Sequence, residues 1–172
     1  SNKLGAIMKN IKSIISLLII ICFTVISVGC NATSSGDSGD SASGDTLSET
    51  YSETEQGWTV KYPAGWTTQK VQSNVSISKT ENLVVKSATM YGTDTTQTLS
   101  EYVDSIIGIP ESAVETSITV DGITATKLVY LLGYYIMQVV LVSDSKVYSF
   151  TYSCSVDDLS IGEAMLDTFQ LL

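Results

Sequence analysis

Apolar and polar positions divide the chain into three parts. An apolar run covers residues 14–28, a tract of Gly, Ser and Asp covers residues 31–45, and short runs of alternating apolar and polar residues follow. Alternation with a period of two is typical of strands that bury one face. The pattern therefore predicts an N-terminal leader over residues 1–29, a flexible linker over residues 30–55 and one globular domain over residues 56–172.

Runs of β-branched and aromatic residues predict the strands of the globular domain. The last four runs are separated by very short connections, of which Asp121-Gly122 is a typical two-residue hairpin turn. Such connections are too short for the crossover that parallel neighbours require, so these strands are expected to be antiparallel. The predicted strands are residues 58–62, 75–77, 83–91, 113–120, 123–132, 134–142 and 146–154.

Two capping boxes predict two helices. Thr98 with Glu101 begins the first helix, and Ser160 with Glu163 begins the second. Residues 134–142 are apolar on both faces, which indicates a central strand that is covered on both sides. The expected fold is α+β, with a single antiparallel β-sheet of about six or seven strands flanked by helices.

The apolar run near the N-terminus has the length of a signal-peptide core. It contains about fifteen residues and follows Lys9 and Lys12, whereas a membrane-spanning helix needs roughly twenty. Residues 1–7 precede Met8 and are interpreted as an expression remnant or an upstream start. The tract of Gly, Ser and Asp that follows the leader holds no core-forming residue and therefore predicts a flexible tether.

The leader ends in Ser27-Val28-Gly29-Cys30, which resembles the lipobox of bacterial lipoproteins. The resemblance implies that Cys30 carries a diacylglycerol thioether and becomes the N-terminus after cleavage. The expected location is the extracytoplasmic face of the cell membrane, with a Gram-positive surface favoured by the Lys-only, Ile-rich composition. Ser27 stands where such boxes usually carry Leu. The alternatives are a secretory signal in which Cys30 is incidental, or an uncleaved anchor.

Several segments of the globular domain follow one another in a recognisable order. The first is Gly57-Trp-Thr-Val-Lys-Tyr-Pro-Ala-Gly-Trp66, a strand that ends in Tyr-Pro-x-Gly-Trp. Residues 99–102, residues 120–126, residues 146–152 and a final helix with Met165 and Phe169 come after it. Together they resemble the PsbP/Mog1-like family over residues 57–172, which implies an α/β/α sandwich. The family includes photosystem-associated lumenal proteins, a nuclear-transport factor and bacterial lipoproteins of undefined role, so the resemblance implies a fold more than an activity.

The charge of the chain excludes one class of partner. The chain has nine Lys, no Arg, no His and eighteen Asp plus Glu. Three of the lysines lie in the leader, so the part from Cys30 onward carries six Lys against all eighteen acids, a net charge of −12. Binding to a phosphate backbone depends on clustered Lys and Arg. No nucleic acid is therefore expected as a partner.

The residue types also argue against catalysis. Without His, the chain can build neither a Ser-His-Asp nor a Cys-His centre, and it lacks the commonest metal ligand. No Gly-rich phosphate loop and no Cys-x-x-Cys pair occurs. The adjacent acids Asp157 and Asp158 precede the second helix, where carboxylates favour the helix N-terminus. The expectation is a protein that is not an enzyme and that holds no cofactor.

Three further acids allow two interpretations, ordinary turn residues or ligands of a metal ion. Asp94, Asp121 and Asp144 lie in predicted turns, which are the ordinary position of Asp. A weak Ca²⁺ or Mn²⁺ site built from several of them is the alternative.

The aromatic residues near the first strand allow two interpretations. Trp58, Tyr62 and Trp66 flank the Tyr-Pro turn and form either a corner of the core or an exposed aromatic platform for binding a partner. Cys154 is expected to be buried on an aromatic strand face, as is usual for a free cysteine.

Three functional hypotheses follow. The first is a lipid-anchored, non-catalytic interaction domain that docks onto or assists a membrane-associated protein complex or an envelope component. The second is a surface binding protein for a small ligand, a divalent metal or a glycan. The third is a carboxylate-dependent hydrolase, which would need two convergent acids in one pocket.

Overall fold

The computed structural model describes residues 46–172. The predicted leader, the lipobox with Cys30 and the Gly/Ser/Asp tract lie outside the described residues. No helix in residues 46–172 is both long enough and apolar enough to cross a membrane.

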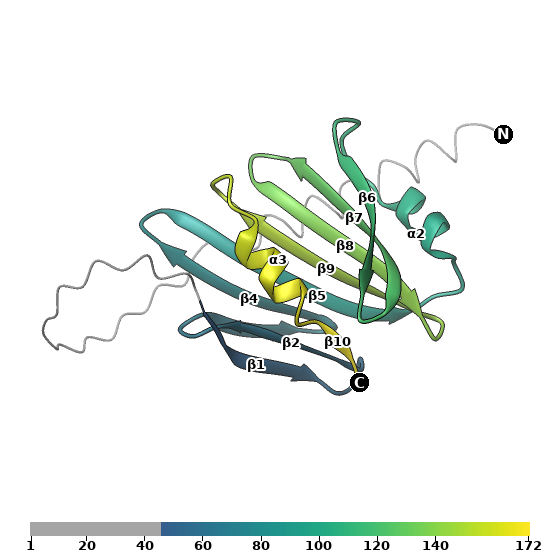
Figure 1. The fold of residues 1–172 in the computed structure, drawn as a ribbon, viewed down its shortest axis with the longest axis horizontal. Coiled ribbons are helices and arrows are strands. Elements are labelled where there is room, and N and C mark those ends of the chain that lie inside the picture. The colour runs from purple at the N-terminus through teal and green to yellow at the C-terminus, as the bar shows by residue number, and fades with distance from the viewer. Residues whose placement is uncertain (1–45) are drawn as a thin grey trace, which may run out of the picture. The chain divides into compact units, whose positions relative to one another are not determined.

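A seven-stranded antiparallel sheet forms the centre of the domain (Figure 1). Every neighbouring pair in it is antiparallel, as the short connections predicted. The turn Asp121-Gly122 joins two of its strands with both residues at positive φ, +49° and +79°, which is the conformation of a two-residue hairpin. In spatial order the strands are β3 (Thr67–Val71), β4 (Asn74–Glu81), β5 (Val84–Asp94), β9 (Lys146–Cys154), β8 (Tyr135–Ser143), β7 (Ile123–Leu131) and β6 (Val114–Val120).

A second, three-stranded sheet was not predicted. It consists of β1 (Leu47–Glu53), β2 (Trp58–Pro63) and β10 (Gln170–Leu171), in the order β1-β2-β10. The expectation of a single sheet is therefore wrong, and so is the end of the linker at residue 55. The strand β1 has the sequence LSETYSE, whose mostly polar residues carry no core pattern of their own. Its antiparallel pairing with β2 makes it a strand.

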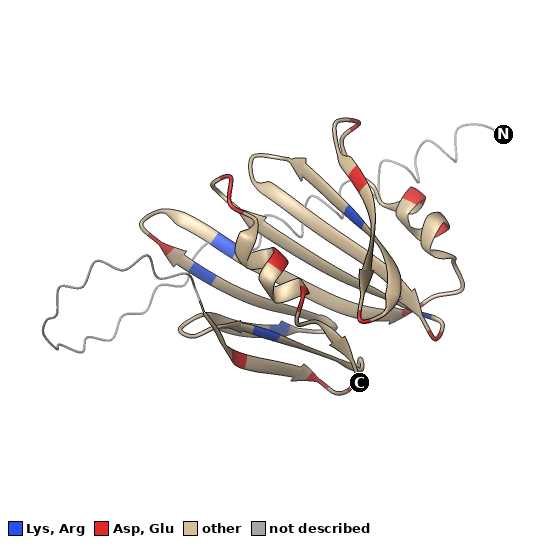
Figure 2. Ribbon diagram, in the orientation of Figure 1, with Lys and Arg blue, Asp and Glu red and all other residues tan. Residues whose placement is uncertain are grey.

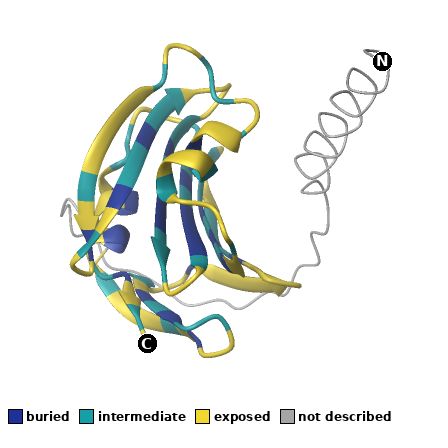
Figure 3. Ribbon diagram, turned by 90° about the vertical axis from the view of Figure 1, so that its right-hand side faces the viewer, coloured by how far each residue is buried: buried dark blue, intermediate teal, exposed yellow. Residues whose placement is uncertain are grey.

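The two helices cover opposite faces of the large sheet (Figure 1). Helix α2 (Leu99–Ser105) packs on the face that carries Val140, and helix α3 (Ser160–Leu166) packs on the face that carries Val139. These two neighbours in β8 are both buried, which confirms the predicted central strand. The small sheet contributes to the same core as α3, so the buried residues lie in layers on either side of the large sheet (Figure 3). The α+β class is confirmed.

One helix begins as predicted and the other does not. In α2, Thr98 and Glu101 form the expected capping box. In α3, the N-cap is Leu159 and the predicted box of Ser160 with Glu163 is wrong. The carboxylate of Asp158 accepts hydrogen bonds from the backbone N–H and the hydroxyl of Ser160, at 3.2 and 2.6 Å. An acid before the helix thus takes the capping role.

Candidate functional site

The predicted aromatic platform is not on the surface. Trp58 is 0% exposed and Trp66 is 6% exposed, while Tyr62 is half-buried. The indole of Trp58 stacks on Phe169, with ring centroids 5.9 Å apart. The structure therefore contradicts an interaction surface built from these residues and confirms the alternative, a corner of the core. Their burial follows from the small sheet, which packs its β2 face onto the large one.

The predicted acids do not converge on one point. Asp121 accepts a hydrogen bond from the backbone N–H of Leu171 at 2.9 Å, which ties the β6–β7 turn to the C-terminal strand. Asp144 lies in the β8–β9 turn and Asp94 ends β5. Within residues 46–172, no group of three or more acid or cysteine side chains is placed to hold a metal ion. Cys154 is a buried free thiol in the aromatic core, as predicted.

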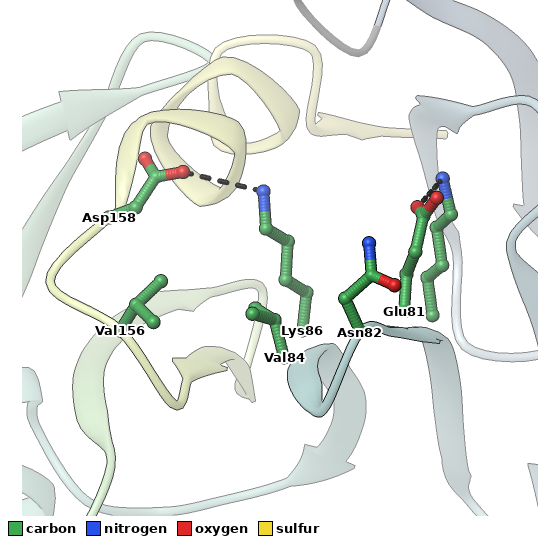
Figure 4. Close-up of a pocket in the computed structure, with 7 residues that line it drawn as sticks. Glu81, Asn82, Val84, Lys86, Val156 and Asp158 are labelled. Carbon is green, nitrogen blue, oxygen red and sulfur yellow. Dashed lines mark hydrogen bonds and ion pairs between the residues drawn. The ribbon is translucent and has the colours of Figure 1, made fainter.

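An open pocket of about 350 Å³ lies where the β4–β5 turn meets the segment before α3 (Figure 4). Two ion pairs occupy it: Lys86 Nζ lies 3.3 Å from Asp158 Oδ2, and Lys79 Nζ lies 2.8 Å from Glu81 Oε2. The hydrogen bond from the Ser160 hydroxyl holds the pKa of Asp158 below its usual value, so this carboxylate stays ionised and is unsuited to act as a general acid. Each cation in the pocket already faces an anion.

The outer face of the large sheet, on β3, β4, β5, β9 and β8, has an unusual residue composition. Side chains along a strand alternate between the faces. Because Ile77, Ala88 and Phe150 lie in the core, the alternate residues of their strands project from the opposite face. We call this surface the hydroxyl face. It consists of Thr67, Gln69, Ser76, Ser78, Ser87, Thr89, Gln138, Thr151 and Ser153.

The strand register places these side chains in rows. Ser76 pairs with Thr89, Thr89 with Thr151, and Thr151 with Gln138. The next row runs through Ser78, Ser87 and Ser153 in the same way. The residues of both rows on β4, β5 and β9 are half-buried by their neighbours. Helix α2 packs on this side over β7 and β8, and its Tyr102 hydroxyl lies 2.8 Å from the hydroxyl of Tyr91 on β5.

No charged residue projects from this face. Strands β3, β4, β5, β7, β8 and β9 carry few charges (Figure 2). Within these described strands, the alternation of side chains places each charged residue on the same side of the sheet as the core residues. The charged positions are Lys70, Lys79, Glu81, Lys86, Asp94, Lys127 and Lys146. A protein with eighteen acids thus keeps this side of the sheet neutral from β3 to β7, and the first acid on the same side is Glu115 of β6, which is paired with Leu128.

Sequence reasoning missed the hydroxyl face, although its signal is in the sequence. Most residues that alternate with core positions in β4, β5 and β9 are Ser or Thr, as in Ser76-x-Ser78 and Thr151-x-Ser153, and the exceptions are Asn74, Val85, Tyr91 and Val147. Each short motif alone is an ordinary solvent-facing strand. Only the pairing of the strands shows that the motifs are neighbours.

Comparisons with known proteins concern the fold. No family model matches this chain, and no curated protein sequence matches it. The structure of cyanobacterial PsbP (CyanoP) from Synechocystis sp. PCC 6803 is similar, with a TM-score of 0.53 and 15% identity. The similarity covers 78% of this chain and 98% of that one.

A second similar structure is a protein from Bacteroides thetaiotaomicron VPI-5482, with a TM-score of 0.54 and 8% identity over 74% of this chain. The matched region is 49% of that protein, so this chain spans about half of its length. At such identities the likeness concerns the fold alone. The described domain therefore has a PsbP-like α+β fold.

Proposed function

We propose that this chain is a non-catalytic interaction domain that docks a partner on its hydroxyl face. The observation that carries the proposal is the absence of charge from this broad and partly open surface. Fully buried parts of interfaces are depleted of charged residues, because burying a charge costs free energy unless it is paired. A neutral face of hydroxyls and amides avoids that cost and still offers hydrogen-bond donors and acceptors.

The partner that suits this surface has a neutral, polar docking surface of its own. We infer a membrane-associated protein complex or another envelope component. The open pocket of Figure 4 also supports binding over catalysis, because each of its two lysines is neutralised by a neighbouring carboxylate. The PsbP-like fold is compatible with such a role.

The test introduces one charge into the face. Thr151→Lys places an ammonium group at the centre of the hydroxyl face, on β9. Thr50→Lys makes the same change at an exposed position of β1, away from the face. Cells that produce the full chain are cross-linked, and the proteins that co-purify are quantified against both variants.

One partner that is retained by the wild type and by Thr50→Lys, and lost by Thr151→Lys, supports the proposal. A partner that is retained equally by all three proteins contradicts it. Melting curves of both variants verify that the loss is not due to unfolding. Binding to an isolated cell-wall glycan, with no protein partner, would move the function to the second hypothesis.

We further infer that the domain is held at the membrane by a lipid on Cys30. The support is the sequence Ser27-Val28-Gly29-Cys30 and the apolar run before it. Cys30→Ala is expected to move the protein from the detergent phase to the aqueous phase, because a diacylglycerol is the attachment. Cys22→Ala, which removes a thiol inside the leader, is the matched control and is expected to stay in the detergent phase. Retention of Cys30→Ala would exclude the lipid anchor.

A further inference from the structure

The strand β6 is a free edge of the large sheet. It pairs with β7 on one side, and no strand among the described residues pairs with its other side. It forms the outermost strand at the left of Figure 3, and most of its residues are exposed. Val114 at its start is 63% exposed. A regular strand of seven residues with an open backbone is a template for pairing with another chain.

The hairpin turn determines which backbone groups are open. The residues that flank a two-residue turn exchange both backbone hydrogen bonds, and hydrogen-bonded pairs then alternate with non-bonded pairs. Val120 and Ile123 flank the turn, so Val120 directs its N–H and C=O toward β7. By alternation, Glu115, Ser117 and Thr119 direct theirs away from the sheet.

β6 has few of the features that protect edge strands, and its one charged residue is Glu115. It has no Pro, no Lys and no break in its register with β7. The opposite edge, β3, has only five residues, and its Lys70 points inward to an ion pair with Glu53. The two edges of the sheet are thus different, and β6 is the one that is left open.

The sequence of β6 is complementary to itself. In an antiparallel pair centred on Ser117, that residue meets its own copy and Glu115 meets Thr119. These are the three residues whose backbone groups point outward, so the pair forms about six backbone hydrogen bonds. The two Glu115 side chains then lie roughly 13 Å apart. A parallel pair in the same register would place them side by side, which is unfavourable.

The side chains on the other face of β6 also match. The exposed Val114 is placed opposite Val120 of the second copy. Thr116 is likewise placed opposite Ile118. Apolar and β-branched cross-strand pairs of this kind stabilise sheets.

We propose that β6 pairs antiparallel with β6 of a second copy of this chain, in a register centred on Ser117. The pairing joins two seven-stranded sheets into one continuous sheet and makes the protein a dimer. This edge differs from the hydroxyl face, so the dimer leaves that face open. The dimer proposal is therefore tested independently of the function proposed above.

The experiment uses opposite charges at the two-fold centre. Ser117→Lys and Ser117→Glu each place two like charges opposite each other, which is expected to raise the dimer Kd about tenfold. An equimolar mixture of the two variants places Lys opposite Glu and is expected to restore dimers. Thr50→Lys, the same kind of change at an exposed position of β1, is expected to leave the Kd unchanged. Sedimentation of the full chain in detergent gives the Kd of the wild type, of each variant and of the mixture.

Weak dimers for each single variant and recovery in the mixture establish the pairing. Recovery also shows that the variants are folded, because a misfolded chain would not regain a partner. A wild-type chain that is monomeric at about 100 μM overturns the proposal. A wild-type dimer that is insensitive to both Ser117 variants also overturns it, since the contact would then lie elsewhere.

Discussion

Lys70 and Glu53 form an ion pair between the two sheets of this domain. Nζ of Lys70, on β3, lies 3.0 Å from both carboxylate oxygens of Glu53, on β1. Glu53 is only 3% exposed. A buried carboxylate is costly without a cation, so this contact fixes the position of β1 against the edge of the large sheet.

Removing the cation should therefore destabilise the domain. We expect Lys70→Met to lower the melting temperature by several degrees, because the buried carboxylate loses its partner. Lys61→Met removes the same charge from an exposed position of β2 and should have little effect. Thermal denaturation followed by circular dichroism measures both. The double variant Lys70→Met/Glu53→Gln should recover part of the loss, and equal losses for Lys70→Met and Lys61→Met would disprove the role of the pair.

Gly162 lets helix α3 approach strand β9. A Cβ at position 162 would overlap the Tyr152 side chain, and it would lie 2.8 Å from the Tyr152 Cβ. In an exposed helix, Gly→Ala stabilises by about 0.5–1 kcal/mol. Here the sign should reverse, and we expect Gly162→Ala to destabilise by about 1–3 kcal/mol, the usual cost of overpacking.

Urea denaturation gives the free energy of unfolding for this variant. A double-mutant cycle with Tyr152→Ala is the control, because it removes Cγ and Cδ1, the two atoms that a Cβ at position 162 would approach most closely. The two changes together should then cost less than the sum of the single changes. Simple additivity would show that the approach of α3 to β9 is not limited by this contact.

The capping box of α2 should contribute measurably to local stability. Thr98 Oγ1 accepts from the Glu101 N–H at 3.4 Å, and Glu101 Oε2 accepts from the Thr98 N–H at 2.8 Å. Thr98→Ala should cost about 1 kcal/mol. The amides of α2 should exchange faster with deuterium, while those of α3 should not. Ser100→Ala, at the second position of the same helix, should slow the exchange slightly because Ala favours helices.

Asp158 should make stability depend on pH. The hydrogen bond from the Ser160 hydroxyl is the main cause of its lowered pKa, and the Ser160 N–H and Lys86 act in the same direction. The unfolded chain therefore takes up this proton first as the pH falls. The stabilisation is complete above the ordinary pKa of about 3.9 and is lost as the pH falls through the lowered value.

Asp158→Asn should accordingly be less stable than the wild type at neutral pH and should lose less stability below about pH 4. Urea denaturation at a series of pH values measures the difference. Asp157→Asn, a change at the exposed neighbouring acid, is the matched control. Parallel pH profiles for Asp158→Asn and the wild type would contradict the prediction.

The sequence by itself determined the elements that carry a clear period. Strands β2 and β4 to β9 were predicted from runs of β-branched and aromatic residues, and α2 was predicted from Thr98 and Glu101. The turn Asp121-Gly122 fixed the β6–β7 hairpin for the same local reason. Each of these signals lies within a few neighbouring residues, where a pattern can be recognised without knowledge of the rest of the chain.

Only the tertiary structure decided the remaining features. β1 and β3 are too polar to be recognised alone, and β2 and β4 pair with them. The local sequence around Trp58 and Trp66 does not distinguish a buried tryptophan from an exposed one, and the packing of the small sheet buries both. The hydroxyl face is likewise invisible until the register aligns residues such as Ser76 and Thr151 from distant strands. The physical reason is that alternation gives each strand two faces, whereas contacts between segments far apart in the chain decide what each face meets.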